Sequence, residues 1–175
     1  TENTFLQFVE SRWYGWMGRE RSKPNFVWDL MSRRFAPRLK NGKAPVLLLL
    51  SGLRTDQWLS MQSLLEGMFE VKVEHQWSLL PGIPEVSRLA LLGGASQKVL
   101  AAEKPEWRWP SPERMSDPAL LAGLLRRSLN LGEHDVDVRV AVTCEQGRDL
   151  SKRSDGLGTA RMTAVVFEFA QMSWE

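Results

Sequence analysis

Groups with the chemistry of a hydrolytic or anion-binding site fall in three short segments of the sequence. These segments are 51–54 (Ser-Gly-Leu-Arg), 80–84 (Leu-Pro-Gly-Ile-Pro) and 144–147 (Cys-Glu-Gln-Gly). Ser51 and Gly52 directly follow an apolar run, and a turn between a strand and a helix exposes backbone N–H groups to an anion. Gly82 can serve similarly, so a phosphate or nucleotide pocket without turnover is one function that these segments allow.

Two sets of residues have the types needed for nucleophilic catalysis, and neither is complete. Cys144 carries a thiol that His134 could activate, but a lone cysteine at a strand end is more often a small buried hydrophobe. Ser51 and Glu145 have the types of a hydrolytic pair. They lack an activating imidazole, since His75 and His134 are the only histidines of the chain and neither is placed to act on Ser51.

Four segments have the apolar pattern of β-strands. Residues 44–50 form a continuous apolar run, which is typical of a strand buried on both faces of a parallel sheet. A helix expected over 55–68 and an alternating segment at 69–74 would complete a strand–helix–strand unit. Further strands are expected at 135–144 and 162–169.

The intervening segments are expected to form helices and loops around these strands. Apolar residues spaced by three and four predict helices over 4–17, 25–35, 85–92 and 119–129. Pro37 is expected to end the second helix, and Gly93-Gly94 the third. Residues 103–118, with four prolines, predict a loop, and 148–159 predict an irregular polar segment.

Together these patterns predict an α/β fold, a three-layer sandwich with a mainly parallel sheet. Residues 1–40 are expected to form a helical lead-in or linker that docks on an α/β domain spanning 41–175. Ligands bind at the carboxyl ends of strands in open α/β sheets. We therefore expect Ser51, Gly82 and Glu145 to converge at one edge of the sheet.

Residues 53–58 read Leu-Arg-Thr-Asp-Gln-Trp and follow the first expected strand. This segment resembles the Asp-Asn-Leu-Arg-Tyr-Asp-Gln-Trp motif of PglZ domains, which belong to the alkaline-phosphatase superfamily. The most similar form is the PglZ domain at the end of PorX-type response regulators. The resemblance continues outward over residues 5–98 and returns in a block at 140–147, so it implies a reduced alkaline-phosphatase-like fold.

The resemblance also implies a chemistry whose residues this chain has lost. The family uses two zinc-type ions, a threonine nucleophile, and aspartate and histidine ligands. Its first metal-binding aspartate is here Ser51, its nucleophile position falls on Gly82, and its Asp-His pair falls on Glu145 and Gln146. The interval 95–134 is also short for the family, which places further ligands there. We therefore expect a pseudo-enzyme, with no metal and no other cofactor.

Arg54 and Arg88 both match motifs of the resemblance beside the vanished metal site. They are candidate anion-binding groups. Without metal-bound anions their charges need other compensation, so we expect them to pair with Glu85, Asp56 or Glu145.

Trp107, Arg108 and Trp109 form a candidate interface. On an extended chain both indoles point to one side and the guanidinium to the other, and tryptophan and arginine dominate interface energetics. The alternative is that both indoles fill the space left by the family's missing subdomain.

Composition excludes several classes of protein. The chain has 175 residues, a net charge of +2 and one cysteine, which suits a single globular domain of a reducing compartment, so we expect a cytoplasmic protein. Neither a membrane span nor a strong nucleic-acid signal is present in the sequence. Because Thr1 replaces a start methionine and no signal peptide follows, we expect a fragment of a longer protein.

These observations favour a catalytically inactive PglZ-like output domain of a bacterial two-component response regulator. Such a domain would act through a protein partner or through self-association. Two alternatives stay open: a domain that senses a nucleotide or phosphate without turnover, and a residual phosphodiesterase or phosphohydrolase with a rebuilt site. An upstream receiver domain is implied by the resemblance alone.

Overall fold

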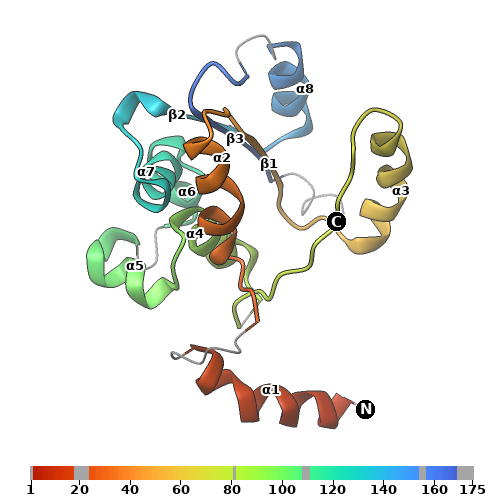
Figure 1. The fold of residues 1–175 in the computed structure, drawn as a ribbon, viewed down its shortest axis with the longest axis vertical. Coiled ribbons are helices and arrows are strands. Elements are labelled where there is room, and N and C mark those ends of the chain that lie inside the picture. The colour runs from red at the N-terminus through yellow and green to blue at the C-terminus, as the bar shows by residue number, and fades with distance from the viewer. Residues whose placement is uncertain (1, 18–23, 81, 108–110, 154–156, 169–175) are drawn as a thin grey trace.

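The sheet in the described part of the chain has three strands, and they are parallel. The computed structural model describes residues 2–17, 24–80, 82–107, 111–153 and 157–168 (Figure 1). Strands β1 (Val46–Leu50), β2 (Val136–Ala141) and β3 (Met162–Phe167) lie in the order β1-β3-β2. The protein is therefore a small α/β sandwich with a parallel sheet, which confirms the fold class expected from the apolar runs.

One face of the sheet is apolar across all three strands. Side chains alternate between the faces of a strand, and the register places Leu47 and Val138 on either side of Ala164. This face packs against helix α7 (Pro118–Leu129). The buried leucines of α7 recur at helical spacing and are Leu120, Leu121, Leu124, Leu125 and Leu129.

Helix α4 (Pro84–Gly93) packs against α7 and belongs to the same core. Its ends follow from local chemistry. Pro84 occupies the first turn, where its missing N–H is not needed. Gly94 ends the helix with a φ of 63°, a left-handed conformation that glycine adopts without the steric cost of a Cβ.

Short and peripheral helices complete the described chain. Those before β2 are α1 (Glu2–Met17), the π-helical turn η1 (Met31–Phe35), α2 (Ala36–Lys40), α3 (Thr55–Glu66), α5 (Gln97–Glu103), η2 (Pro105–Trp107), α6 (Pro112–Met115) and η3 (Glu133–Asp135), and α8 (Cys144–Lys152) follows β2. Within the described residues, none of the helices is long and apolar enough to cross a membrane.

On the second face of the sheet, α8 packs against β2. Crossovers between parallel strands are right-handed. The connection from β1 to β2 crosses the sheet in one direction, and the connection from β2 back to β3 crosses it in the other. Their helices, α7 and α8, therefore lie on opposite faces (Figure 1). Thr163 and Val165 point toward the α8 side, and both are buried. Arg139 of β2 donates a hydrogen bond to the carbonyl of Arg153 at the end of α8, which ties this layer to the sheet.

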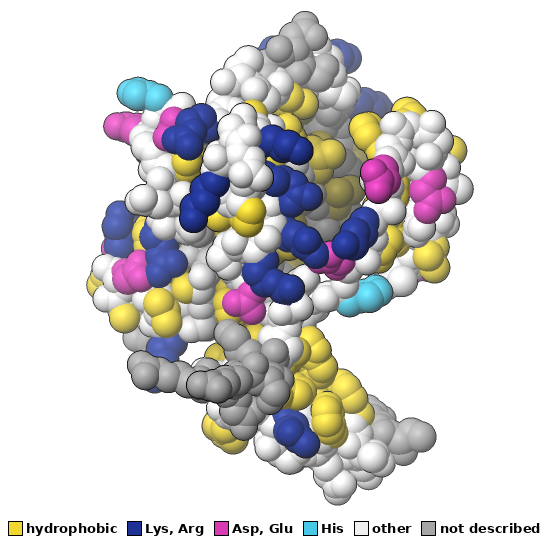
Figure 2. All heavy atoms as spheres, viewed as in Figure 1, with side chains coloured by type: hydrophobic (Ala, Val, Ile, Leu, Met, Phe, Trp, Pro, Cys, Tyr) yellow, Lys and Arg dark blue, Asp and Glu magenta, His cyan; other side chains and the backbone are white. Residues whose placement is uncertain are grey.

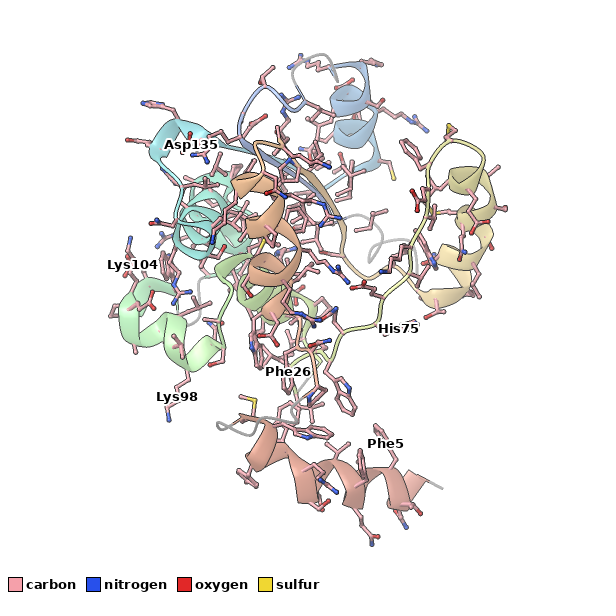
Figure 3. The ribbon with its side chains drawn as sticks, in the orientation of Figure 1. Phe5, Phe26, His75, Lys98, Lys104 and Asp135 are labelled. Carbon is pink, nitrogen blue, oxygen red and sulfur yellow. The ribbon has the colours of Figure 1, made fainter. Side chains whose placement is uncertain are left out.

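A separate aromatic cluster joins α1 to the rest of the molecule. Trp16 packs edge-to-face on Trp77, and Trp13 packs on Phe26 in the same way. Phe26 is fully buried and stacks on Trp28, and it lies between α1 and the α/β layers (Figure 3). These tryptophans therefore pack in a second hydrophobic core.

The strand expected at 69–74 does not form in the structure. The chain from 70 to 76 is extended but pairs with no strand, and only Trp77 makes a bridge, to Phe26. β1 pairs instead with β3, from the far end of the chain. The strand–helix–strand prediction for 44–74 is therefore wrong, because the alternating segment 69–74 makes no ladder of hydrogen bonds with β1.

The prediction that β1 is buried on both faces is also wrong. Val46 and Leu48 are 41% and 57% exposed, whereas Leu47 between them is buried. β1 is an edge strand, and α3, the helix that follows it, has no buried residue. Figure 1 shows α3 standing away from the sheet. In the part of the chain that the structure describes, the outer face of β1 therefore lacks the helical layer that its apolar sequence predicts.

The second helical segment extends beyond Pro37, the residue that was expected to end it, and continues to Lys40. In the π-helical turn before this proline, the Ala36 N–H bonds the Met31 carbonyl. This wider turn accommodates a proline, which has no N–H to donate, without ending the helix.

Two polar segments expected to be irregular are also partly helical. Segment 103–118 includes η2 and α6, and residues 148–152 of the second segment belong to α8. The strand expected to reach Cys144 ends at Ala141 because Thr143 caps α8.

Candidate functional site

Polar groups gather at the carboxyl edge of the sheet, where two neighbouring strands end. Ser51 follows β1, and its N–H donates to the carbonyl of Phe167 at 2.9 Å. Glu168 follows β3, and its N–H donates to the carbonyl of Ala141 at 2.9 Å. The parallel ladder therefore brings Ser51 and Glu168 to the same edge, although they lie at opposite ends of the sequence.

Arg88 of α4 reaches this edge and joins the two positions. Its Nη1 lies 2.5 Å from Oε1 of Glu168 and donates to Oγ of Ser51 at 3.3 Å. Its Nη2 donates to the carbonyl of Met115 at 3.1 Å. The second oxygen of Glu168 accepts a hydrogen bond from Ser116 Oγ at 2.5 Å. We call Arg88, Glu168, Ser51 and Ser116 the Arg88 cluster.

The Arg88 cluster is buried, which makes its charge balance important. The side chains of Arg88 and Glu168 are 3% and 13% exposed. A charge removed from water to this degree is costly unless a partner and hydrogen bonds compensate it. Glu168 supplies the opposite charge, although Nε of Arg88 and Oε1 of Glu168 have no hydrogen-bond partner among the described residues. The pair therefore connects α4 to the ends of β1 and β3.

A pocket of about 340 Å³ opens beside the cluster. Arg88 and the carboxylates of Glu85 and Glu168 line it, together with Ile83 and Ser116. Two carboxylates therefore face one guanidinium that is already paired. This balance is unfavourable for an anion, because a phosphate entering the pocket would have to compete with Glu168 for Arg88 and approach Glu85.

The structure places the four predicted site positions differently. Ser51 is buried in the Arg88 cluster. Gly82 precedes α4, and a Cβ there would meet nothing within 4 Å. Glu145 and Gln146 are exposed in the first turn of α8, which follows the carboxyl end of β2. The structure thus brings Ser51 and Arg88 into contact, while Glu145 contributes no hydrogen bond to the cluster in the described part of the chain.

Gln146 caps the amino-terminal end of α8. Its Oε1 accepts hydrogen bonds from the N–H groups of Val142 and Thr143, at 2.8 and 3.3 Å. Its own N–H donates to Oγ1 of Thr143 at 3.2 Å. This is a capping box, in which each side chain satisfies a free N–H of the helix start. An amide at this position therefore stabilises the start of α8.

Arg54 pairs with Asp56, as expected. The Arg54 Nε donates to Oδ1 of Asp56 at 2.8 Å, and the guanidinium beside it lowers the pKa of Asp56 to about 2. Both side chains are more than half exposed. Arg88 also has a partner, but that partner is Glu168, so the expectation of Glu85 or Glu145 is wrong.

The sequence reasoning missed Glu168 and Ser116. A signal for Glu168 exists, because it is a charged residue directly after an apolar strand, the same position that singled out Ser51 after β1. Ser116 lies in a turn between α6 and α7 and carries no sequence signal of its own.

Trp107 is buried, with 7% of its surface exposed. It belongs to the core around α7, the Lys104 ammonium lies 4.8 Å from its ring, and Gln97 donates a hydrogen bond to its carbonyl. The structure therefore favours the space-filling role of this indole over the interface role. Arg108 and Trp109 lie outside the described residues.

Cys144 is exposed at the start of α8, so the expectation of a small buried hydrophobe is wrong. The thiol is exposed because the residue begins a helix and does not lie inside a strand. Groups of three or more histidine, cysteine, aspartate or glutamate side chains able to hold a metal are absent from the part of the chain that the structure describes.

A second feature is apolar and exposed. Leu48 of β1 and Leu59 and Leu64 of α3 are 57%, 62% and 71% exposed. Figure 2 shows hydrophobic side chains in the hollow between α3 and the rest of the molecule. We call this surface the β1–α3 face, and its members are Val46, Leu48, Leu59, Met61, Leu64 and Met68. Exposed large apolar side chains gathered in one part of a surface mark interaction sites on soluble proteins.

Comparison of the sequence with models of known protein families gives no match, and comparison with curated proteins gives none either.

Proposed function

We propose that this chain is a catalytically inactive, PglZ-like output domain of a bacterial response regulator, located in the cytoplasm, that acts through protein–protein contact. The absence of catalysis is supported by residue types. Serine, glycine and glutamine stand at Ser51, Gly82 and Gln146, where the resemblance implies a metal-binding aspartate, a nucleophile and a histidine. The family membership itself is carried by the motif at 53–58 and its neighbours.

The observation that carries the interaction role is the exposed β1–α3 face. β1 has a free edge and the sequence Val-Leu-Leu-Leu-Leu, without the charges, internal proline or bulge that usually protect an edge strand. A second copy of the chain suits this edge, because two β1 strands related by a two-fold axis would extend the sheet and join their apolar faces. Self-association is therefore the contact that we propose.

The Arg88 cluster gives less support to phosphate or nucleotide sensing. Its guanidinium is compensated by Glu168, and its pocket carries two carboxylates. A binding protein for anions would instead present an uncompensated cation to its ligand.

Sedimentation velocity over a range of concentrations tests the proposal. We expect the wild-type chain to form dimers, and the double variant Leu48→Ser/Leu64→Ser to remain monomeric. Val99→Ser is the matched control, because Val99 is 44% exposed on α5, away from the β1–α3 face, and this variant should dimerise normally.

Thermal unfolding with added phosphate or nucleotide tests the competing function. A ligand that binds the folded state raises the melting temperature, and we expect no rise. A monomer at every concentration, stabilised by phosphate or by a nucleotide, would overturn the proposal in favour of sensing. Hydrolysis of a phosphodiester by the metal-supplemented protein would instead identify a surviving enzyme.

A further inference from the structure

Among the described residues, no strand pairs with the outer edge of β1, and the direction of its amides can be assigned. The Ser51 N–H bonds Phe167, and the Pro45 carbonyl accepts from Thr163, so the N–H groups of odd-numbered residues in β1 point toward β3. In a strand these groups alternate in direction. The amides of Leu48 and Leu50 therefore point to the free edge.

Segment 69–75 has the sequence of a strand that has no sheet. Phe69, Val71 and Val73 alternate with Glu70 and two other charged residues, Lys72 and Glu74. The Phe69 N–H still bonds the carbonyl of Leu65 at the end of α3, but residues 70–75 pair with no strand in the described chain. Phe69 and Val73 are 64% and 47% exposed. Its charges are those that protect edge strands, and β1 has none of them.

This segment already lies close to β1. A hollow of about 410 Å³ is lined by Pro45 and Val46 on one side and by Lys72 and Glu74 on the other. The ion pair between Glu74 and Arg34 holds the segment in its present position. His75 lies on the connection that leads from α3 to the body of the molecule (Figure 3).

The chain between β1 and this segment suits a crossover. Parallel neighbours need a connection of a dozen or more residues, usually with a helix, and α3 supplies a helix of 12 residues. In a right-handed crossover that helix lies over the sheet. The apolar side chains on the face of α3 that turns toward the sheet would then meet the exposed face of β1 at Leu48.

We propose that segment 69–75 adds to β1 as a fourth parallel strand, and that α3 moves with it onto the outer face of the sheet. The structure is then the open form of the domain. Closing replaces an unprotected edge with a charged one, fills the hollow beside Val46, and covers the β1–α3 face. The inference rests on the proposed function in one respect: closing would regulate self-association by hiding its surface.

Amide hydrogen exchange resolved by NMR, on dilute wild-type protein, tests the closed form. We expect the Leu48 and Leu50 amides to exchange at least about tenfold more slowly than in a Lys72→Pro/Val73→Pro variant. Successive N–H groups of a strand point in opposite directions, so one of these two prolines removes a donor on the side of β1. Leu47 and Leu49 are internal controls, since their amides point to β3 and should keep the same protection in both proteins. Unaltered Leu47 and Leu49 protection also shows that the variant has folded.

Two results would overturn the inference. The first is unprotected Leu48 and Leu50 amides in the wild-type protein. The second is protection that grows with protein concentration and survives in Lys72→Pro/Val73→Pro, which would assign the edge to a second copy alone. Failure of the proposed function is separable, because it appears in sedimentation as a lack of dimers in every variant. If both proposals hold, Lys72→Pro/Val73→Pro dimerises at lower concentration than the wild type.

Discussion

Leu47 and Leu48 are neighbours in β1, yet they lie in two different environments. Leu47 is 8% exposed and packs in the core formed with α7, and Leu48 is 57% exposed on the opposite face. The α4–α7 side of the sheet is a closed core, whereas the β1–α3 face has apolar residues and no cover. The apolar run alone does not distinguish them. Burial depends on whether another element packs against that face.

The two arginines of the resemblance show the same contrast. Arg88 lies on the closed side and its side chain is 3% exposed, while Arg54 lies at the start of α3 with its side chain 51% exposed. Each has a carboxylate partner. The two ion pairs differ in their effect on the free energy of unfolding, because solvent screens the charges of the exposed pair and not those of the buried pair.

Loss of the buried ion pair should have the largest effect. Arg88→Met leaves the Glu168 carboxylate buried without its partner, and we expect a loss of about 3–5 kcal/mol in the free energy of unfolding. Arg54→Met, the matched control, should cost less than about 1 kcal/mol. Urea denaturation measures both. Equal losses would show that burial does not make the Arg88–Glu168 pair more important for stability than the exposed Arg54–Asp56 pair.

The two leucines of β1 give the next largest difference. Leu47→Ala should cost about 2–5 kcal/mol, because it leaves a cavity in the core. Leu48→Ala should change the free energy of unfolding by about 0.5 kcal/mol or less in the open form, as for other surface substitutions. Denaturation of both variants checks the difference. A large cost at Leu48 would indicate that the closed form, with α3 packed on this residue, is well populated.

Two glycines with left-handed backbones differ in how closely they are packed, so substituting both distinguishes the cost of steric overlap from the cost of backbone strain. Gly42, in the turn before β1, and Gly94, after α4, have φ angles of 71° and 63°. A Cβ at Gly94 would lie 2.9 Å from Cβ of Ser128 in α7, whereas one at Gly42 would meet nothing within 4 Å. Alanine at either position should cost about 1–2 kcal/mol in backbone strain. Gly94→Ala should cost about 1–3 kcal/mol more, from overpacking. Thermal unfolding of the two variants gives this difference, and equal melting temperatures would contradict it.

The smallest effect concerns the exposed pair of α3. The pKa of Asp56 is lowered to about 2, chiefly by its hydrogen bond to Arg54. A lowered folded-state pKa stabilises the fold above the unfolded value of about 3.9, and this stabilisation is lost as the pH falls toward 2. Arg54→Gln should return the pKa of Asp56 toward its ordinary value, which an NMR titration of the carboxyl carbon measures.

Arg127→Gln is the control for this titration. Arg127 lowers the pKa of Glu103 in a similar pair on α5 and α7. Its removal should shift Glu103 and leave Asp56 unchanged. An Asp56 pKa that stays near 2 without Arg54 would mean that the ion pair is not its cause.

Local sequence determined most of the secondary structure. Strands β1, β2 and β3 follow from apolar runs and alternation, and α1, α3, α4 and α7 follow from apolar spacing. The end of α4 at Gly94 also follows from residue type alone. These features are set by neighbours in the sequence, so periodicity and capping chemistry are enough to predict them.

Tertiary structure decided the candidate site and the exposed surface. Ser51 and Arg88 were predicted to lie near each other, but the partner of Arg88 is Glu168, which only the β1-β3 pairing brings to Ser51. Periodicity also could not show that segment 69–75 remains unpaired or that Leu48 remains uncovered. The physical reason is that a pattern specifies which side of an element is apolar, while contacts between distant elements decide which of those sides is buried.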